Sequence, residues 1–165
     1  MSRLTRADAE DILFREARYL DTRDWDKWLD LYRPDATFWV PAWRDEITPT
    51  SDPERELSLI YYRSRRRLEE RVWRIRSGQS VASTPLPRTA HAVTNILPGG
   101  LREKGAQVYA TFTVHRNDVR SEITHIFFGH YEYILVDEGD VWRIQSKKIH
   151  LLNDNIPTVL DIYCV

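Results

Sequence analysis

Long stretches of alternating polar and apolar residues in the second half of the chain constrain its fold more than any other feature. In residues 107–116 every second side chain is apolar, the period of a strand with one buried face: Val108, Ala110, Phe112 and Val114. Strand-like sequence also covers residues 90–97, 122–136 and 141–152. Turn-forming sequences at 98–100, 117–118 and 137–140 separate these stretches, so consecutive strands should run antiparallel.

The first half of the chain predicts helices instead. After a cap at Ser2 or Thr5, apolar residues recur at helical spacing: Ile12, Leu13, Ala17 and Leu20. A second helix is predicted from Asp24, with Trp25 and Trp28 on its apolar face, and a short strand at 37–40. A third helix is predicted over residues 54–71, with this inner face: Leu57, Ile60, Tyr61, Ser64 and Leu68.

Helices followed by a meander of strands indicate the α+β class, and 165 residues are enough for a single domain, residues 1–165. Gly129 inside a long strand indicates a strongly curved sheet. N-terminal helices over the concave face of a curved, mostly antiparallel sheet form the cone-shaped nuclear-transport-factor-2-like fold. This fold is also described as SnoaL-like or scytalone-dehydratase-like.

The charge balance gives no general attraction to nucleic acids or to acidic membranes, because 24 Lys and Arg face 25 Asp and Glu. One segment is nevertheless strongly basic: Arg63, Arg65, Arg66, Arg67, Arg71, Arg74 and Arg76. Glu69 and Glu70 are interleaved with these arginines, and a helix would spread the charges around its circumference. We therefore predict an exposed helix face or a protein contact, and no nucleic-acid binding.

Cysteine content and hydropathy bound the location of the protein. Cys164 is the single cysteine, which excludes an internal disulfide and a cysteine-rich metal site. No apolar run approaches the length of a membrane span, and the first residues lack the apolar region of a secretory signal. We predict a soluble cytoplasmic protein without a membrane partner.

Glu122, His125 and His130 have the spacing Glu-x2-His-x4-His, which resembles an iron-ligand pattern of non-haem oxygenases. The surrounding sequence is strand-like, and residues three or five apart on a strand point to opposite faces. A bulge at Gly129 could bring both histidines to one face, but Glu122 would still point away from His125. We therefore predict ordinary sheet histidines and no metal site here.

The inside of a cone could hold an active site, because an acid or base in an apolar pocket acquires a shifted pKa. The candidates are Tyr32, Asp35, His91, His115 and His150, with Trp39 and Phe112 as walls. Each also has a structural explanation, since Asp35 follows Pro34 in a turn and His91 can be a hydrogen-bonded strand residue. Bulky side chains could equally fill the cone. A stand-alone isomerase or dehydratase, or a small-ligand binding protein, is thus one alternative.

Several segments, taken in order, resemble the small (beta) subunit of aromatic-ring-hydroxylating dioxygenases of the benzoate, toluate and anthranilate type. The opening carries the first of them, which are residues 13–21, 25–32 and 38–43. Further segments follow at 52–53, 56–62, 68–72 and 87–89 with His91, and the resemblance continues through the closing sheet to Asp161. It therefore covers most of the chain.

The resemblance implies a structural subunit of an oxidoreductase complex, with no catalytic, cofactor-binding or metal-binding residue of its own. A large catalytic (alpha) subunit would carry a Rieske [2Fe–2S] cluster and mononuclear Fe(II), and the small subunits would form a trimer within an α3β3 hexamer. A reductase would supply electrons from NADH, and the complex would dihydroxylate an aromatic ring, of the carboxylate-bearing type, with O2. A Rieske cluster needs two cysteines, which this chain lacks. The six tryptophans and the arginine cluster would then suit subunit interfaces.

Overall fold

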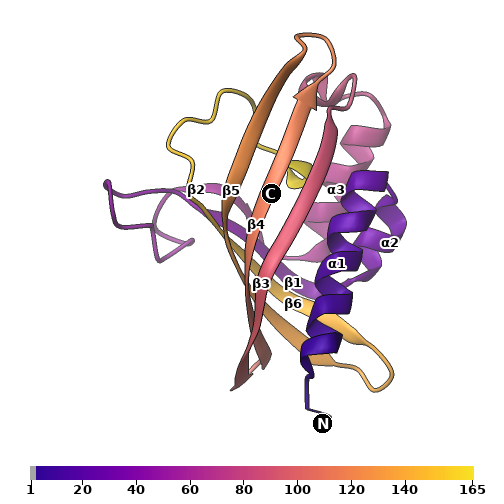
Figure 1. Ribbon diagram of the computed structural model, residues 1–165, viewed down its shortest axis with the longest axis vertical. Helices are drawn as coiled ribbons and strands as arrows, with labels where there is room; N and C mark the ends of the chain where they lie inside the picture. Colours follow the sequence, from indigo (N-terminus) through magenta and orange to yellow (C-terminus); the bar gives the residue numbers. More distant parts are fainter. Residues whose placement is uncertain (1–2) are drawn as a thin grey trace.

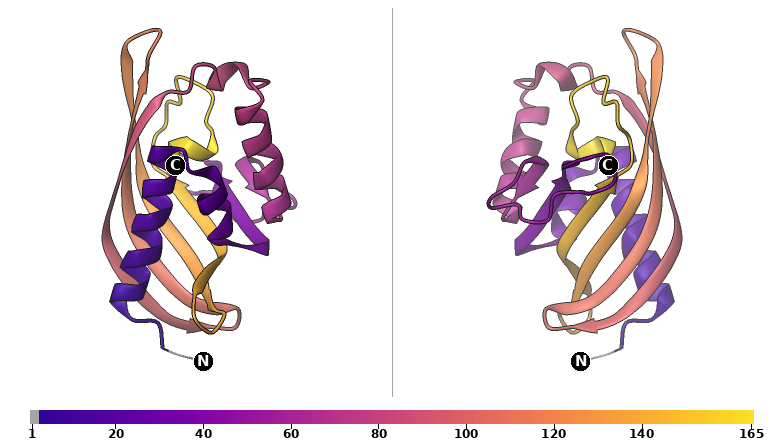
Figure 2. Two further views of the ribbon diagram at one scale, coloured as in Figure 1. Left: turned by 90° about the vertical axis from the view of Figure 1, so that its right-hand side faces the viewer. Right: turned by 90° about the vertical axis from the view of Figure 1, so that its left-hand side faces the viewer.

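A computed structural model describes residues 3–165, and its strands form one sheet wrapped around the helices (Figures 1 and 2). The helices are α1 (Arg6–Thr22), α2 (Trp25–Asp30) and α3 (Arg65–Arg76), with short 3-10 turns η1 (Val81–Ser83) and η2 (Ile162–Cys164). The strands are β1 (Tyr32–Pro41), β2 (Ser58–Tyr62), β3 (Arg88–Arg102), β4 (Gly105–Asp118), β5 (Ile123–Asp137) and β6 (Trp142–Leu151). The predicted α+β class is confirmed.

The strand order within the described residues is β2-β1-β6-β5-β4-β3. All neighbours pair antiparallel except β1 and β6, which are parallel. The alternation that predicted β4 is borne out, because Val108, Phe112 and Val114 are fully buried. On the same face, the ring of Phe112 stacks on that of Tyr131 with centroids 4.2 Å apart. The long meander β3–β6 therefore supplies the concave wall of the core.

Helix α1 lies across the concave side of the sheet and packs on β3 (Figure 2). Its start is fixed by a capping box in which Thr5 Oγ1 accepts from Asp8 N and the Asp8 carboxylate accepts from Thr5 N. Thr5 is therefore the cap, whereas Ser2 lies outside the described residues. Ile12, Leu13 and Leu20 are buried, as their helical spacing predicted.

Helix α2 contributes aromatic residues to the core. Trp25 and Trp28 are 4% and 0% exposed, and Trp28 packs edge-on against Tyr32 with centroids 5.2 Å apart. The expectation that the tryptophans serve interfaces is therefore wrong for these two, because the concave sheet needs large side chains to fill it. Trp73 on α3, at 58% exposed, remains available at the surface.

The third predicted helix, over residues 54–71, is only partly correct. Residues 58–62 form strand β2, which pairs with β1 in the register Phe38 to Tyr62 and Val40 to Ile60. Leu57, expected on an inner helix face, is 82% exposed. The β-branched and aromatic residues of β2 favour a strand once an edge is free for pairing. Helix α3 starts only after Ser64 and runs to Arg76.

The predicted turn at residues 98–100 is also wrong. Strand β3 continues to Arg102, and Pro98 and Gly100 instead mark an irregularity in its pairing with β4. Proline and glycine are tolerated here because β3 is an edge strand of the sheet. The chain turns two residues later, just before Gly105, which has a φ of 144°.

Gly129 allows the paired strands β5 and β6 to approach each other closely. It sits between Phe112 on β4 and Leu151 on β6, and a Cβ there would lie 1.9 Å from the backbone oxygen of His150. A backbone atom cannot move away without shifting β6. Gly129 thus permits the close approach of β6 to β5 within the curved sheet that was predicted (Figure 2).

We expect Gly129→Ala to lower the free energy of unfolding by about 1–3 kcal/mol or more, as overpacking does in closely packed interiors. Gly99→Ala is the matched control, since its Cβ would meet the side-chain ring of Tyr109 at 2.6 Å, and that ring can move. Urea unfolding midpoints measure both. Equal losses would contradict the steric role of Gly129.

Candidate functional site

The inside of the cone holds a buried ion pair. Glu16 on α1 and Lys147 on β6 place Oε1 and Nζ 3.0 Å apart, with side chains 2% and 1% exposed. The two residues belong to opposite ends of the chain. The pair therefore connects the first helix to the last strand across the core.

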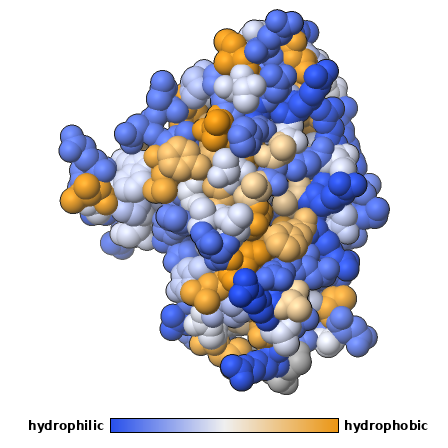
Figure 3. All heavy atoms as spheres, in the orientation of Figure 1, coloured by the Kyte–Doolittle hydropathy of each residue, from blue (hydrophilic) through white to orange (hydrophobic). Residues whose placement is uncertain are grey.

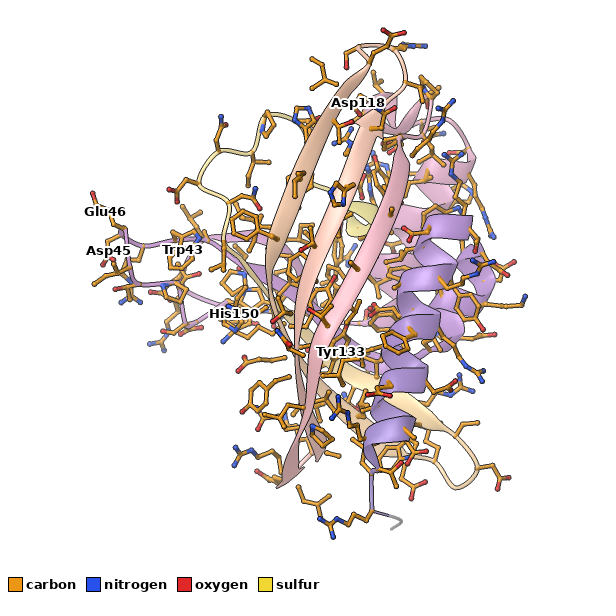
Figure 4. The ribbon with its side chains drawn as sticks, viewed as in Figure 1. Trp43, Asp45, Glu46, Asp118, Tyr133 and His150 are labelled. Carbon is orange, nitrogen blue, oxygen red and sulfur yellow. The ribbon has the colours of Figure 1, made fainter. Side chains whose placement is uncertain are left out.

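Two tyrosines complete the hydrogen bonding of the Glu16 carboxylate. Tyr32, at the start of β1, donates to Oε1, and Tyr133 on β5 donates to Oε2 at 2.5 Å. Figure 4 labels Tyr133 within the concave part of the molecule. Lys147 Nζ lies 4.3 Å from the ring centroid of Tyr131, a cation–π contact. Helix α1 and strands β1, β5 and β6 thus each contribute a side chain to this cluster around one carboxylate and one ammonium group.

Electrostatics favour the ionised form of the Glu16 carboxylate. Burial alone raises the pKa of Glu16, but the charge of Lys147 and the bonds from Tyr133 and Tyr32 bring it below its ordinary value. Burial lowers the pKa of Lys147, and the charge of Glu16 opposes that change. Burial also raises the pKa of both tyrosines well above the usual range, so they remain neutral donors.

The polar groups of this site are hydrogen-bonded to one another, and this limits the chemistry that the site can perform. Each oxygen of Glu16 accepts from a tyrosine, and Lys147 bonds to Glu16 and approaches the backbone oxygen of Val165 at 3.5 Å. A general base needs a lone pair within reach of a substrate proton. The arrangement instead fits an internal brace.

A second cluster joins the end of α1 to β3. The Asp21 carboxylate accepts from Thr89 Oγ1 at 2.9 Å and from the backbone N of His91 at 2.8 Å, and contacts His91 Nδ1 at 2.6 Å. Burial raises the pKa of Asp21, but the bonds and charge of His91 outweigh it and lower that pKa. His91 Nε2 is buried without a hydrogen-bond partner in the described part of the chain. This carboxylate–imidazole pair is the feature closest to catalytic geometry.

The structure scatters the other residues proposed for a cone active site. Tyr32 reaches the interior, and Phe112 is a core residue. Asp35 is exposed, and its nearest cation is Arg33 at 3.6 Å. His150 contacts Glu132 at 2.9 Å in the sheet, His115 is exposed, and Trp39 donates to Ser58. No common pocket is therefore formed by the predicted set.

The metal pattern does not assemble a site. On β5 the buried residues alternate through Phe127, Gly129 and Tyr131, so His125 and His130 fall on opposite faces, as predicted. Glu122 lies before the strand at a φ of 59°. Among residues 3–165, no group of three or more His, Cys, Asp or Glu could hold a metal ion. With one cysteine, buried near the C-terminus, the donors do not fit a Rieske cluster either.

Sequence reasoning missed Glu16 and Lys147, although each leaves a signal. Glu16 lies four residues from both Ile12 and Leu20, in the middle of the apolar stripe of α1. Lys147 has the same strand parity as the buried Ile149 and Leu151. A charge on each of two predicted inner faces is a reason to expect a buried pair.

Open surface hollows lie outside the cone. One, of about 690 Å³, is formed by β2 and α3 and includes Tyr62, Arg67 and Arg74. The outer face of β3–β5 carries exposed Leu97, Ile126 and Phe128, and apolar side chains are interspersed with charged ones on the face seen in Figure 3. None of the helices in residues 3–165 has the length and hydropathy to cross a membrane. These surfaces, more than the interior, are accessible to partners.

Comparison with known proteins places the chain in a family. Residues 15–158 match the model of the ring hydroxylating beta subunit family, and the chain belongs to that family. It is 43% identical to the 2-halobenzoate 1,2-dioxygenase small subunit of Burkholderia cepacia over 96% of this chain and 94% of that one. It is 41% identical to the toluate 1,2-dioxygenase beta subunit of Pseudomonas putida, over 94% of each chain. The predicted family is thereby confirmed.

Solved structures confirm the fold. The beta subunit of benzoate 1,2-dioxygenase from Burkholderia mallei aligns over 100% of both chains with a TM-score of 0.82 and 34% identity. A scytalone dehydratase homologue from Novosphingobium aromaticivorans aligns over 94% of this chain and 91% of its own, with a TM-score of 0.67 and 14% identity. The cone-shaped, scytalone-dehydratase-like fold was thus predicted correctly.

We expect Glu16→Ala to lower the free energy of unfolding by about 3–5 kcal/mol, because it leaves Lys147 charged and buried. A combined variant with Glu16→Leu, Lys147→Met, Tyr32→Phe and Tyr133→Phe should recover most of that loss, since the carboxylate, the ammonium group and both hydroxyls are removed together and only the backbone oxygen of Val165 loses a partner. Glu10→Ala, which breaks the exposed Arg6–Glu10 pair on the same helix, should cost about 0–1 kcal/mol. Urea denaturation measures all three, and a stable Glu16→Ala protein would contradict the brace.

Proposed function

We propose that the chain is the non-catalytic small subunit of a multicomponent dioxygenase that dihydroxylates an aromatic carboxylate. The observation that carries this proposal is the identity of 37–43% to small subunits of halobenzoate, toluate, benzoate and anthranilate dioxygenases over 92–96% of this chain. Every one of those four names describes an enzyme whose substrate is a benzoate-type ring. We infer that residues 1–165 act as one domain, since α1 and α3 both pack on the single sheet.

The filled cone supports a structural role for this chain. Two interior groups that could act as acid or base, Glu16 and Lys147, are bonded to each other, and Glu16 is also bonded to two tyrosines. Non-haem iron oxygenases hold their metal with two histidines and a carboxylate, and no group of three or more His, Cys, Asp or Glu within residues 3–165 could hold a metal ion. We therefore assign no catalytic, cofactor-binding or metal-binding residue here.

The partners follow from the same proposal. A large catalytic subunit would hold the Rieske [2Fe–2S] cluster and the mononuclear Fe(II), and a reductase would pass electrons from NADH to it. Small subunits would associate as a trimer within an α3β3 hexamer in the cytoplasm. This chain would set the geometry of that assembly and contribute no atom to the reaction.

A stand-alone dehydratase or isomerase is the second candidate, and the Asp21–His91 pair is the observation that favours it. The buried, unpartnered Nε2 of His91 is where a base would act if a substrate could reach it. The His91 side chain is 1% exposed, however, and the same carboxylate clamps Thr89 and the backbone of His91. We therefore favour a clamp that fixes the end of α1 on β3.

Assembly gives the direct test. The chain is produced alone and together with a large subunit from the same source, and light scattering with metal analysis measures mass and iron. We expect an iron-free species alone, and an iron-containing hexamer that converts benzoate in the presence of O2, reductase and NADH. A chain that ignores the large subunit would overturn the proposed function.

His91→Asn in the assembled enzyme tests whether His91 takes part in dioxygenase turnover. We expect turnover per iron to stay within about twofold of the parent, because a clamp acts on stability and not on the reacting atoms. Asp35→Asn is the control, as an exposed carboxylate outside the cone. Loss of turnover by about a hundredfold with the hexamer intact, the range of a lost general base, would contradict the non-catalytic role proposed for this chain.

A further inference from the structure

An arm projects from the body of the molecule (Figure 1). Residues 42–57 connect β1 to β2 and extend away from the sheet on the side opposite the helices (Figure 1). Asp45 and Glu46 lie at its far end, and Trp43 lies nearer the body (Figure 4). Beside them Ile47 is 86% exposed. An apolar side chain at the end of a protruding segment is costly in water unless it meets a partner.

Internal hydrogen bonds give the arm its shape. Arg44 N donates to Thr48 O and Thr50 N donates to Ala42 O, both at 2.8 Å, and Asp45 Oδ1 accepts from Ile47 N at 2.9 Å. Because the backbone of the arm is satisfied locally, its tip is presented in a fixed conformation. A preformed tip loses little conformational entropy when it binds.

Glu56 braces the base of the arm. Its carboxylate accepts from Ser51 N at 2.6 Å and from Asp52 N at 2.8 Å, and it pairs with Arg44. These backbone bonds and the nearby guanidinium lower the pKa of Glu56 to about 2. Trp43 Nε1 donates to Leu151 O at 3.0 Å and ties the arm to β6. These bonds hold the base of the arm beside β6.

The outer face of α3 offers complementary chemistry. We define this arginine face as Arg66, Arg67, Glu70, Trp73 and Arg74. Arg66 and Arg67 share Glu70, and Arg74 has no ion pair within residues 3–165. Three arginines and one glutamate leave two positive charges, whereas the tip of the arm carries the two negative charges of Asp45 and Glu46.

The arm and the arginine face also both expose apolar side chains. Trp73 is 58% exposed and lines one hollow with Arg66 and Arg74. Exposed tryptophan flanked by arginine is the composition of residues that dominate binding energy at protein interfaces. Ile47 supplies an apolar side chain of suitable size beside the acidic tip.

We propose that the arm of one copy of this chain docks on the arginine face of α3 in a second copy. The tip of the arm and α3 lie on different sides of the molecule (Figure 1), so the arm of one copy cannot reach the arginine face of the same copy. A contact between two different surfaces repeats from copy to copy and produces a ring when the rotation closes. This contact specifies how the copies in the proposed trimer of small subunits bind one another, and it therefore rests on the trimer that belongs to the proposed function.

Charge reversal in both directions tests the contact. Glu46→Lys and Arg74→Glu are each made alone and then combined in one chain, and sedimentation equilibrium measures self-association of the purified chain. Each single change should weaken association by about tenfold or more, because it places like charges together in every contact of the ring. The combined variant should regain most of the lost association, since it restores an opposite-charge pair.

Glu103→Lys and Arg18→Glu are the matched controls, because they make the same charge changes at exposed positions on a sheet turn and on α1. Both should associate like the parent chain. Circular dichroism and urea midpoints check that every variant is folded. The proposal fails if the single variants behave like the controls, if the combined variant does not recover, or if the parent chain is monomeric.

Binding to the large subunit is measured on the same variants, so that the two proposals can fail separately. A monomeric chain that still forms a complex with the large subunit would overturn the arm contact and leave the proposed function intact. Variants that no longer bind the large subunit but self-associate like the parent chain would also overturn the arm contact between copies. They would indicate that the arm binds the large subunit instead.

Discussion

The buried contact between Glu16 and Lys147 is the interaction on which the rest of the structure depends. It joins α1 to β6, and the tyrosines that bond Glu16 come from β1 and β5. Removing either charge would leave the other in an apolar interior, where an unpaired ion costs several kcal/mol. The pair therefore requires the helix, the central strands and the chain end to assemble together, even though these segments are far apart in sequence.

The same contact explains how a fold that can enclose an active site becomes a scaffold. A cone has room for a base and a substrate, but here four polar side chains and stacked aromatic rings occupy that room. Close packing around them extends to Gly129, where β6 leaves no space for a Cβ. The interior therefore has no room for a substrate. The surface remains accessible, and there the arm and the arginine face of α3 can bind other subunits.

Much of the fold was predictable from the sequence, because local patterns report local structure. The strict alternation in β4 and the spacing of apolar residues in α1 identified their buried faces correctly. Prediction failed where pairing decided the outcome. Residues 58–62 could be helix or strand by composition, and the free edge of β1 makes them a strand. Pro98 and Gly100 resemble a turn, but an edge strand tolerates them.

The sequence by itself determined the α+β class, the family, and the absence of enough cysteine for a Rieske cluster, since these depend on composition and on the order of segments. Only the tertiary structure decided which polar groups meet. Glu16 and Lys147 are 131 residues apart, and His91 finds Asp21 from 70 residues away. No periodicity encodes such a distance, because it arises from how α1 lies across the curved sheet.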